Sequence, residues 1–239
     1  MKKGRRIIQC LAVLILISGL VVLLFPHISQ WLYTQKVDNL ATSFESAITE
    51  KQDTRLDELY QFMVKENERL NQEGQKDLVD PFSYEQPAID LTQYGIEDNL
   101  VGFISIPDID ETLPIYLGAN EENMKKGAVH MTQTSYPVGG TNTNSVIAAH
   151  RGYSQATMFR HIDRLQTGNI VYIRNFHELL EYRVTEIKII SPDESNEILI
   201  QPQRDMLTLM SCHPYRQNKQ RYLVYCERTN TSPASQQID

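Results

Sequence analysis

The chain has 239 residues, of which 41% are hydrophobic, and a formal net charge of -7 at pH 7. This length and composition are ordinary for one globular domain with short appendages. The acidic balance and the lack of a long Lys/Arg run argue against a nucleic-acid partner, because binding to phosphates needs clustered positive charge.

Residues 7–25 form a nearly uninterrupted apolar run that is long enough to cross a bilayer as a helix. Basic residues precede this run, and no comparable basic cluster follows it. The positive-inside bias therefore predicts a cytoplasmic tail at residues 1–6, a transmembrane anchor at 7–25 and an extracellular remainder. A cleaved signal peptide is the alternative. It is less favoured because signal cores are shorter and no small-residue cleavage site follows Phe25.

Residues 26–73 are predicted to form a helical arm, since apolar residues recur at helical spacing over 36–70. The polar stretch 49–55 is where two helices would separate. The apolar stripe is interpreted as a face that packs on the protein's own core, with binding to a partner as the alternative. Residues 74–90 have the composition of a polar loop centred on Asp80-Pro81-Phe82, because proline disfavours helix at the residue before it.

Residues 91–229 are predicted to form a mainly β domain, because short β-like runs alternate with Pro, Gly and Asn. The expected strands are 102–106, 113–117, 145–149, 169–173, 181–190, 206–210 and 221–225. Many short strands favour a barrel or a sandwich. One short helix is expected at 158–165, and the polar segment 230–239 is expected to be a disordered tail.

Three reactive side chains occur at strand boundaries. Cys212 follows the apolar run 206–210, His150 follows the expected strand 145–149, and Arg221 begins the last strand. Rigid strand ends are good positions for catalytic groups. A cysteine nucleophile needs positive charge nearby to form a thiolate, and acyl transfer needs a proton donor and an oxyanion donor. Cys212, His150 and Arg221 together offer these functions.

The other cysteines and histidines leave alternatives. Cys212 and Cys226 are the two cysteines outside the predicted anchor, so a structural disulfide between them competes with catalysis. No Cys-x-x-Cys pair or His cluster indicates a metal site. His213 adjoins the thiol, but neighbouring strand residues point to opposite faces, which favours His150. Surface or core positions are expected for His130, His161 and His177.

Two segments of the chain, around Cys212 and around His150, resemble the sortase family. Thr208-Leu209-Met210-Ser211-Cys212 is similar to the sortase signature Thr-Leu-x-Thr-Cys, with Arg221 at the expected distance. The stretch 130–152 is similar to the family segment that ends in the catalytic His, here His150. Ser211 replaces the usual Thr but keeps its hydroxyl. The resemblance implies a closed β-barrel of about eight strands, with Thr208 and Ser211 in supporting positions.

Asp80-Pro81-Phe82 resembles the Asp-Pro-aromatic lid of class C sortases, the pilin polymerases. The resemblance implies that Asp80 lies near Arg221 and that Phe82 covers Cys212. Residues 74–90 would then form a lid loop in front of the barrel. The subclass implies that the chain takes part in pilus assembly.

The implied reaction needs no cofactor or metal. Cys212 attacks the Thr carbonyl of an LPXTG-like sorting signal, His150 protonates the departing Gly amine, and Arg221 steadies substrate or oxyanion. The amine of a pilin Lys then resolves the thioacyl-enzyme. The implied partners are pilins or surface proteins with a C-terminal sorting signal, together with a pilin Lys or cell-wall amine as acceptor. The implied location is the membrane of a Gram-positive bacterium, with the catalytic domain outside.

Three other functions remain open from the sequence. A sortase that anchors surface proteins to peptidoglycan would differ only in its acceptor. An extracellular cysteine hydrolase would use the same Cys212 and His150 but release a free acid. A membrane-anchored scaffold would contain a Cys212–Cys226 disulfide, whereas the sortase interpretation predicts that Cys226 is reduced.

Overall fold

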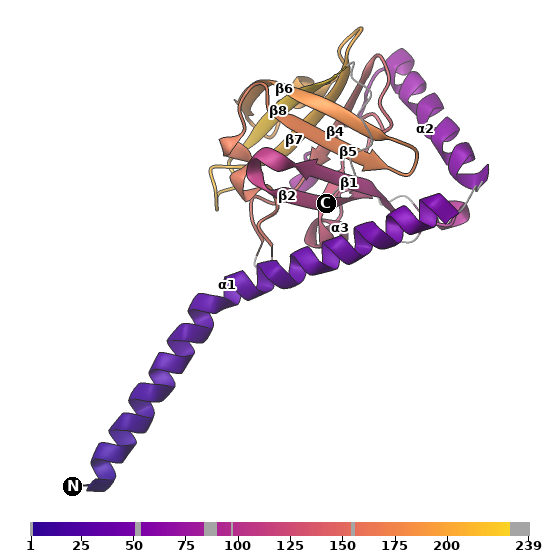
Figure 1. Ribbon diagram of the computed structural model, residues 1–239. Helices are drawn as coiled ribbons and strands as arrows, with labels where there is room; N and C mark the ends of the chain where they lie inside the picture. Colours follow the sequence, from indigo (N-terminus) through magenta and orange to yellow (C-terminus); the bar gives the residue numbers. More distant parts are fainter. Residues whose placement is uncertain (1, 51–53, 84–89, 97, 154–155, 230–239) are drawn as a thin grey trace.

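The computed structural model of the protein describes residues 2–50, 54–83, 90–96, 98–153 and 156–229. The expected tail 230–239 and part of the expected lid loop, residues 84–89, lie outside the described residues. Figure 1 shows one long helix attached to a β-barrel, with a second helix beside the barrel.

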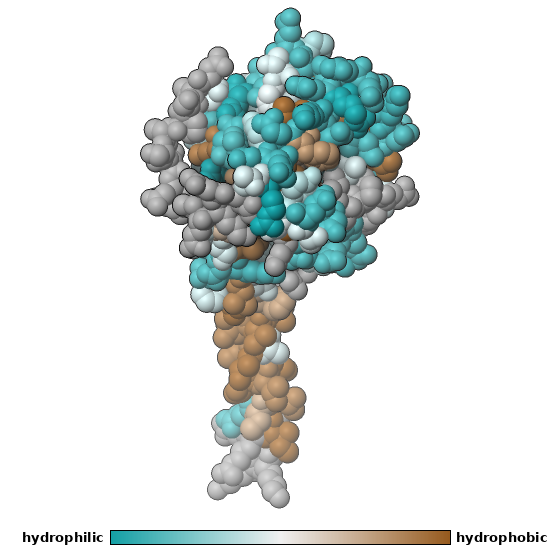
Figure 2. All heavy atoms as spheres, turned by 90° about the vertical axis from the view of Figure 1, so that its right-hand side faces the viewer, coloured by the Kyte–Doolittle hydropathy of each residue, from teal (hydrophilic) through white to brown (hydrophobic). Residues whose placement is uncertain are grey.

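Helix α1 (Lys2–Glu50) contains the whole apolar run and continues past Pro26 without a break. Its first half projects away from the barrel, and Figure 2 shows apolar residues covering this stalk on the face in view. Leu16 and Val22 are about three-quarters exposed, at 73% and 74%. Among the described residues, α1 is the one helix long and apolar enough to cross a membrane. Exposed apolar side chains at this density are costly in water, which fits a lipid environment.

The second half of α1 and helix α2 (Thr54–Glu73) cover parts of the barrel. Val37 of α1 is buried on the barrel's outer face, and Arg174 makes a two-point ion pair with Glu45 of α1 at 2.6 and 2.8 Å. Leu59 and Met63 of α2 are fully buried. The expected separation of two helices at 49–55 is confirmed by the end of α1 and the start of α2.

The barrel closes in the strand order β1-β2-β3-β4-β7-β8-β6-β5, which confirms the predicted closed barrel. Two neighbouring pairs, β2–β3 and β4–β7, are parallel, and the other pairs are antiparallel. The strands are β1 (Leu100–Ile106), β2 (Glu111–Leu117), β3 (Ala128–His130), β4 (Thr143–Ala148), β5 (Ile170–Asn175), β6 (Leu179–Ile190), β7 (Asp205–His213) and β8 (Gln220–Arg228).

Alternation along the strands separates the barrel interior from its outer face. Leu207, Leu209 and Val224 belong to a buried cluster that draws residues from all eight strands, so they point into the barrel. Met210 and Leu223 belong to a second cluster, which includes Val37 of α1 and lies on the outer face. The even-numbered residues of β7 therefore point outward and the odd-numbered residues of β8 do likewise.

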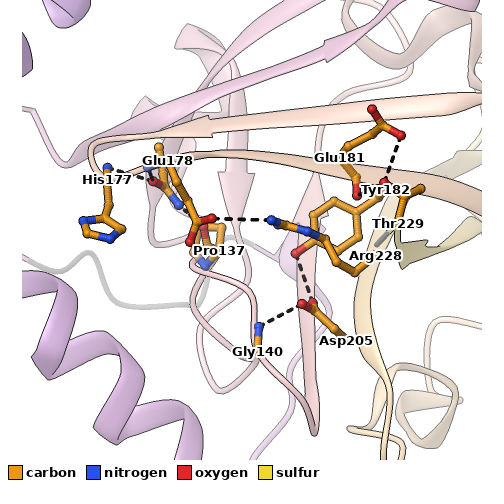
Figure 3. Close-up of polar contacts among 10 residues, drawn as sticks. Pro137, Gly140, His177, Glu178, Glu181, Tyr182, Asp205, Arg228 and Thr229 are labelled. Carbon is orange, nitrogen blue, oxygen red and sulfur yellow. Dashed lines mark hydrogen bonds and ion pairs between the residues drawn. The ribbon is translucent and has the colours of Figure 1, made fainter. Parts of the chain in front are cut away.

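A polar network fixes the end of the barrel where β7 begins (Figure 3). Asp205 accepts hydrogen bonds from the Gly140 N–H at 2.9 Å and from the Tyr182 hydroxyl at 3.1 Å. The network also joins Arg228 to Glu178 and Thr229 to Glu181. Cys212 lies near the other end of β7, about 23 Å from Asp205 at roughly 3.3 Å per residue. The glycine turn before β4 thus anchors the barrel and takes no part in the site at Cys212.

Short elements were missed by the sequence patterns. Strand β3 has three residues, too few for an alternating pattern, and it is recognised only through its pairing with β2 and β4. Helix α3 (Glu121–Lys126) has six residues and is capped by Asn120, whose side chain accepts from the Asn123 N–H at 2.9 Å. The 3₁₀ helices are η1 (Pro81–Ser83), η2 (Thr92–Tyr94), η3 (Pro107–Ile109), η4 (Met158–Arg164) and η5 (Ser195–Ile198).

Candidate active site

Cys212 and Arg221 are paired across the antiparallel strands β7 and β8. Directly opposite residues in such a pair present their side chains on the same face of the sheet. Both point to the outer face, as the positions of Met210 and Leu223 on the same strands show. The hairpin therefore holds a thiol and a guanidinium side by side.

His150 reaches the same face through the parallel pairing of β4 with β7. Ala148 pairs with Met210, and His150 and Cys212 each follow two residues later along their chains. The Ala149 N–H still bonds to the Met210 carbonyl at 3.2 Å, so the two chains stay in register beyond the last strand pair. Because side chains alternate, His150 and Cys212 share one face.

Two hydroxyls tie β7 to β4, that of Ser211 on the interior side of the strand and that of Thr208 on its outer side. The Ser211 hydroxyl donates to the Ala149 carbonyl at 2.8 Å, and the Thr208 hydroxyl donates to the Asn144 side-chain oxygen at 2.8 Å. Both hydroxyl groups are fully buried, so each bond satisfies a polar group that has no access to water. The Ser211 bond lies directly beside both His150 and Cys212 in the sequence.

The segment 80–82 lies over the site. Asp80 forms a two-point ion pair with Arg221, with Nε to Oδ1 at 2.7 Å and Nη2 to Oδ2 at 2.5 Å. The guanidinium carbon of Arg221 lies 5.0 Å from the centre of the Phe82 ring, within cation–π range. The Phe82 ring centre is 6.0 Å from that of His150. Asp80 and Phe82 thus contact the two groups expected to assist the thiol.

A cavity of about 470 Å³ opens at Cys212. Its described lining is Phe82, His150, Arg151, Gly152, Tyr153, Arg160, Cys212, Tyr215, Arg216, Gln217 and Asn218. Besides Phe82 of η1 and Cys212 of β7, the lining comes from the segment after β4, from η4 and from the loop between β7 and β8. Arg221 lines a separate small cavity with Asp80 and Pro81, beneath the segment 80–82.

In this arrangement the thiol is protonated at neutral pH. Burial raises the pKa of Cys212 to about 11; Arg221 lowers it and Asp80 raises it again. The Cys212 thiol donates to the side-chain oxygen of Asn218 at 3.1 Å. Burial also lowers the pKa of His150, so the imidazole is neutral. A neutral Cys–His pair is a resting state, because the thiolate is the nucleophile.

Arg151 lines the cavity and was missed by the sequence reasoning. It is 6% exposed, and its Nη1 atom lies 2.9 Å from Nδ1 of His213. Its Nη2 atom forms an ion pair with Asp163 of η4. Arg151 therefore connects the segment that carries His150 with the end of β7 and with η4. Its place directly after His150 was the one signal in the sequence.

The remaining histidines lie away from the thiol. His213 points to the opposite face of β7 and contacts Arg151 and Tyr222. His130 is buried, its Nε2 atom lies 3.0 Å from the Ser135 carbonyl, and burial lowers its pKa to about 4. His177 stacks on Tyr60 with ring centres 3.9 Å apart. The described residues contain no cluster of three or more metal-ligating side chains.

Cys226 cannot pair with Cys212 in this fold. Cys212 is opposite Arg221, whereas Cys226 is opposite Leu207, five residues further along the strand pair and about 17 Å away at roughly 3.3 Å per residue. Cys226 is also part of the interior cluster, on the other face of the sheet. A disulfide needs Cα atoms less than about 7 Å apart. Both cysteines are free, which removes the basis of the scaffold alternative.

The fold and site define a class: a closed mixed barrel with a thiol, an imidazole and a guanidinium at neighbouring strand ends, under a covering segment. Comparison with protein families matches residues 104–229 to the Sortase domain. The chain belongs to the sortase family of cysteine transpeptidases. Sortases act at the Gram-positive cell surface on LPXTG-type sorting signals, with cell-wall amines as acceptors.

Two curated relatives are sortase D of Bacillus subtilis, 28% identical over 130 residues, and sortase A of Listeria monocytogenes, 28% identical over 144 residues. These alignments cover 53% and 60% of this chain, and 63% of the length of each relative. The chain thus spans less than two thirds of the relatives it matches.

Solved structures of class C sortases are similar over more of the chain. Sortase C of Streptococcus pneumoniae has a TM-score of 0.74 and 30% identity, and the match covers 82% of this chain and 99% of that one. Sortase C1 of Streptococcus agalactiae has a TM-score of 0.75 and 31% identity, covering 81% and 100%. A pilus-related sortase C of Group B Streptococcus has a TM-score of 0.70 and 30% identity, covering 79% and 96%.

Proposed function

We propose that this protein is a membrane-anchored sortase that joins pilin subunits through a thioacyl-enzyme at Cys212. The observation that carries the proposal is the pairing of Cys212 with Arg221 on the face that also bears His150, with Asp80 and Phe82 over them. An acyl transfer needs a nucleophile, a proton carrier and a donor for the oxyanion, and these side chains provide all three.

Acylation begins when the covering segment leaves. Without Asp80 the charge of Arg221 acts on Cys212 alone, which favours transfer of the thiol proton to the neutral His150 and leaves a thiolate beside an imidazolium. The thiolate attacks the Thr carbonyl carbon of the sorting signal, and Arg221 stabilises substrate or oxyanion. The C–N bond to Gly then breaks, and His150 delivers a proton to the departing amine. A thioester to Cys212 and a free peptide amine result.

Transfer reverses these roles. A Lys amine of the next pilin gives its proton to His150 and attacks the thioester carbon. The C–S bond breaks, an isopeptide bond forms, and Cys212 leaves as the thiolate. No metal or cofactor is required at any step.

Pilin polymerisation is favoured over wall anchoring by the covering segment and by the neighbours. The similar pneumococcal structure is described in connection with pilin substrate specificity, and two further neighbours are pilus-related by name. The ion pair between Asp80 and Arg221 gives Asp80-Pro81-Phe82 the contacts expected of a lid. The first half of α1 is proposed as the membrane anchor, with the barrel outside the cell.

The acceptor decides between the two sortase functions. The full-length chain in detergent, with the lid opened by Asp80→Ala and Phe82→Gly, is mixed with a sorting-signal peptide and equal amounts of a Lys-containing pilin and a cell-wall peptide amine. We expect the isopeptide-linked pilin product to dominate in the mass spectrum. Dominant transfer to the wall amine would assign anchoring, and a free acid alone, with both amines present, would assign hydrolysis.

A further inference from the structure

The cavity at Cys212 is positively charged although the chain as a whole carries a net charge of -7. Three arginines line it, at positions 151, 160 and 216, and no acidic residue occurs among its described lining. Arg151 is neutralised by its ion pair with Asp163. The acyl-transfer steps give Arg160 and Arg216 no role.

Arg160 and Arg216 flank one aromatic ring at the rim of the cavity. Their guanidinium carbons lie 5.6 and 5.4 Å from the centre of the Tyr215 ring. Two like charges around one ring repel each other, and the ring offsets this only in part. Within the part of the chain that the structure describes, neither arginine forms an ion pair. An anion between them would relieve the repulsion.

Arg160 is held toward the cavity by its surroundings. A Cβ atom at Gly152 would lie 2.7 Å from Nε of Arg160, so the glycine leaves the space that the guanidinium occupies. The Nε atom is buried without a hydrogen-bond partner. The carboxylate of Glu111 accepts from the Thr157 hydroxyl at 2.6 Å; Arg160 is near enough to lower the pKa of Glu111, but the two form no salt bridge. A buried donor without an acceptor is expected where a ligand supplies one.

We infer that Arg160, Tyr215 and Arg216 form a subsite for an acidic side chain of the peptide substrate, close to the scissile bond. The inference rests on the proposed function, because the ligand that reaches Cys212 in this cavity is then the sorting-signal peptide. Guanidinium groups bind carboxylates through paired, charge-assisted hydrogen bonds. The subsite would select sorting signals by charge, at the variable position between Pro and Thr or directly after Gly.

The test compares peptides that differ in one side chain. Peptides with Glu, Gln or Lys at the variable position, or at the residue after Gly, are given to the lid-opened full-length chain in detergent. The measured quantity is kcat/KM for acylation of Cys212. At one of these positions we expect kcat/KM for the Glu peptide to exceed that for the Gln peptide by about 5- to 20-fold, as for a partly exposed charge pair. The value for the Lys peptide should be lower than that for the Gln peptide. The ratio should fall at high salt.

Charge reversal sharpens the test. Arg216→Glu should invert the order, so that the Lys peptide becomes the best substrate, and Arg216 is exposed enough for the change to leave folding intact. Arg160→Gln should reduce the Glu/Gln ratio toward one. Lys219→Glu is the matched control, because Lys219 lies in the same loop outside the cavity lining, and it should keep the wild-type order.

Two results would overturn the inference, and both are distinguishable from a failure of the proposed function. Equal acylation by the Glu, Gln and Lys peptides at both positions would refute the anionic subsite while leaving the sortase reaction in place. The same order of preference in the Arg216→Glu variant would do so as well. If no peptide acylated Cys212, the proposed function itself would fail.

Discussion

Asp80 neutralises Arg221 at the position where Arg221 lies opposite Cys212. The two-point ion pair joins residues that are 141 positions apart in the chain. The contact has two consequences for the thiol, because it occupies the guanidinium and brings a negative charge that raises the pKa of Cys212. In the proposed lid, Asp80 would therefore act on the chemistry as well as on access.

Opening the lid should activate the thiol. For Asp80→Ala with Phe82→Gly we expect alkylation of Cys212 by iodoacetamide to accelerate at least tenfold at pH 7.5, since exposure and the freed Arg221 both favour the thiolate. The measurement is the rate of adduct formation by intact mass. An unchanged rate would refute the lid.

The pH dependence should separate charge from shielding. The alkylation rate of the wild type should rise with pH up to the pKa of Cys212 near 11, since the thiol loses its proton only as pH approaches that value. Asp80→Asn keeps the side-chain shape but removes the charge, so the midpoint should move to lower pH. Phe82→Ala, with Asp80 retained, provides the comparison for lost shielding alone. Identical midpoints in wild type and Asp80→Asn would contradict the electrostatic role of Asp80.

Arg221 should not be replaceable by lysine. Lysine keeps the charge, but it cannot form the two-point contact with Asp80 or present two parallel donors to an oxyanion. In a lid-opened background we expect Arg221→Lys to lower kcat for acylation by about 10²-fold, as for loss of one oxyanion donor. Single-turnover acylation experiments measure this loss. A loss confined to KM would indicate that Arg221 binds substrate only.

Ser211 should support the position of His150 through its bond to the Ala149 carbonyl. Ser211→Ala removes the donor and leaves a buried carbonyl less well satisfied, so we expect a loss of about 1–2 kcal/mol in the free energy of unfolding. Urea denaturation measures the loss. Ser211→Thr restores the hydroxyl and should recover most of it, whereas equal losses in both variants would assign the effect to packing.

Cys226 should stay reduced in active protein. Its burial in the barrel interior raises the pKa of the Cys226 thiol and keeps it from reagents. Under native, non-reducing conditions we expect one alkylation, at Cys212, within the barrel. Peptide mapping that found a Cys212–Cys226 bridge in active enzyme would contradict the register of β7 and β8.

Local patterns predicted the parts of the fold that depend on local chemistry. Alternating apolar residues located all strands except β3, and the polar stretch 49–55 predicted where α1 ends and α2 begins. The order of strands around the barrel depends on pairings between distant segments, so periodicity alone left barrel and sandwich open. The resemblance to sortases predicted that the strands form a closed barrel, which the structure confirms.

The site was predictable where residues adjoin a motif. Cys212, His150 and Arg221 stand at strand boundaries and in a family signature. Arg151 adjoins His150 in the sequence, but its contact with His213 forms only in the fold. Asn218, Arg160 and Arg216 carry no such signal. The Asn218 contact needs the β7–β8 turn, and the shared ring of the two arginines needs η4 and that loop to meet. Arginines are common in any sequence, and these two are distinguished by the shared Tyr215 ring and by their place in the cavity, which only the fold shows.

The thioacyl-enzyme is tested most directly by the intact mass of the lid-opened, full-length chain in detergent after incubation with a sorting-signal peptide. We expect an added mass equal to the peptide's acyl part, released by hydroxylamine and absent in Cys212→Ala. An adduct that persists in Cys212→Ala, or no adduct with any sorting-signal peptide, would contradict the thioacyl mechanism.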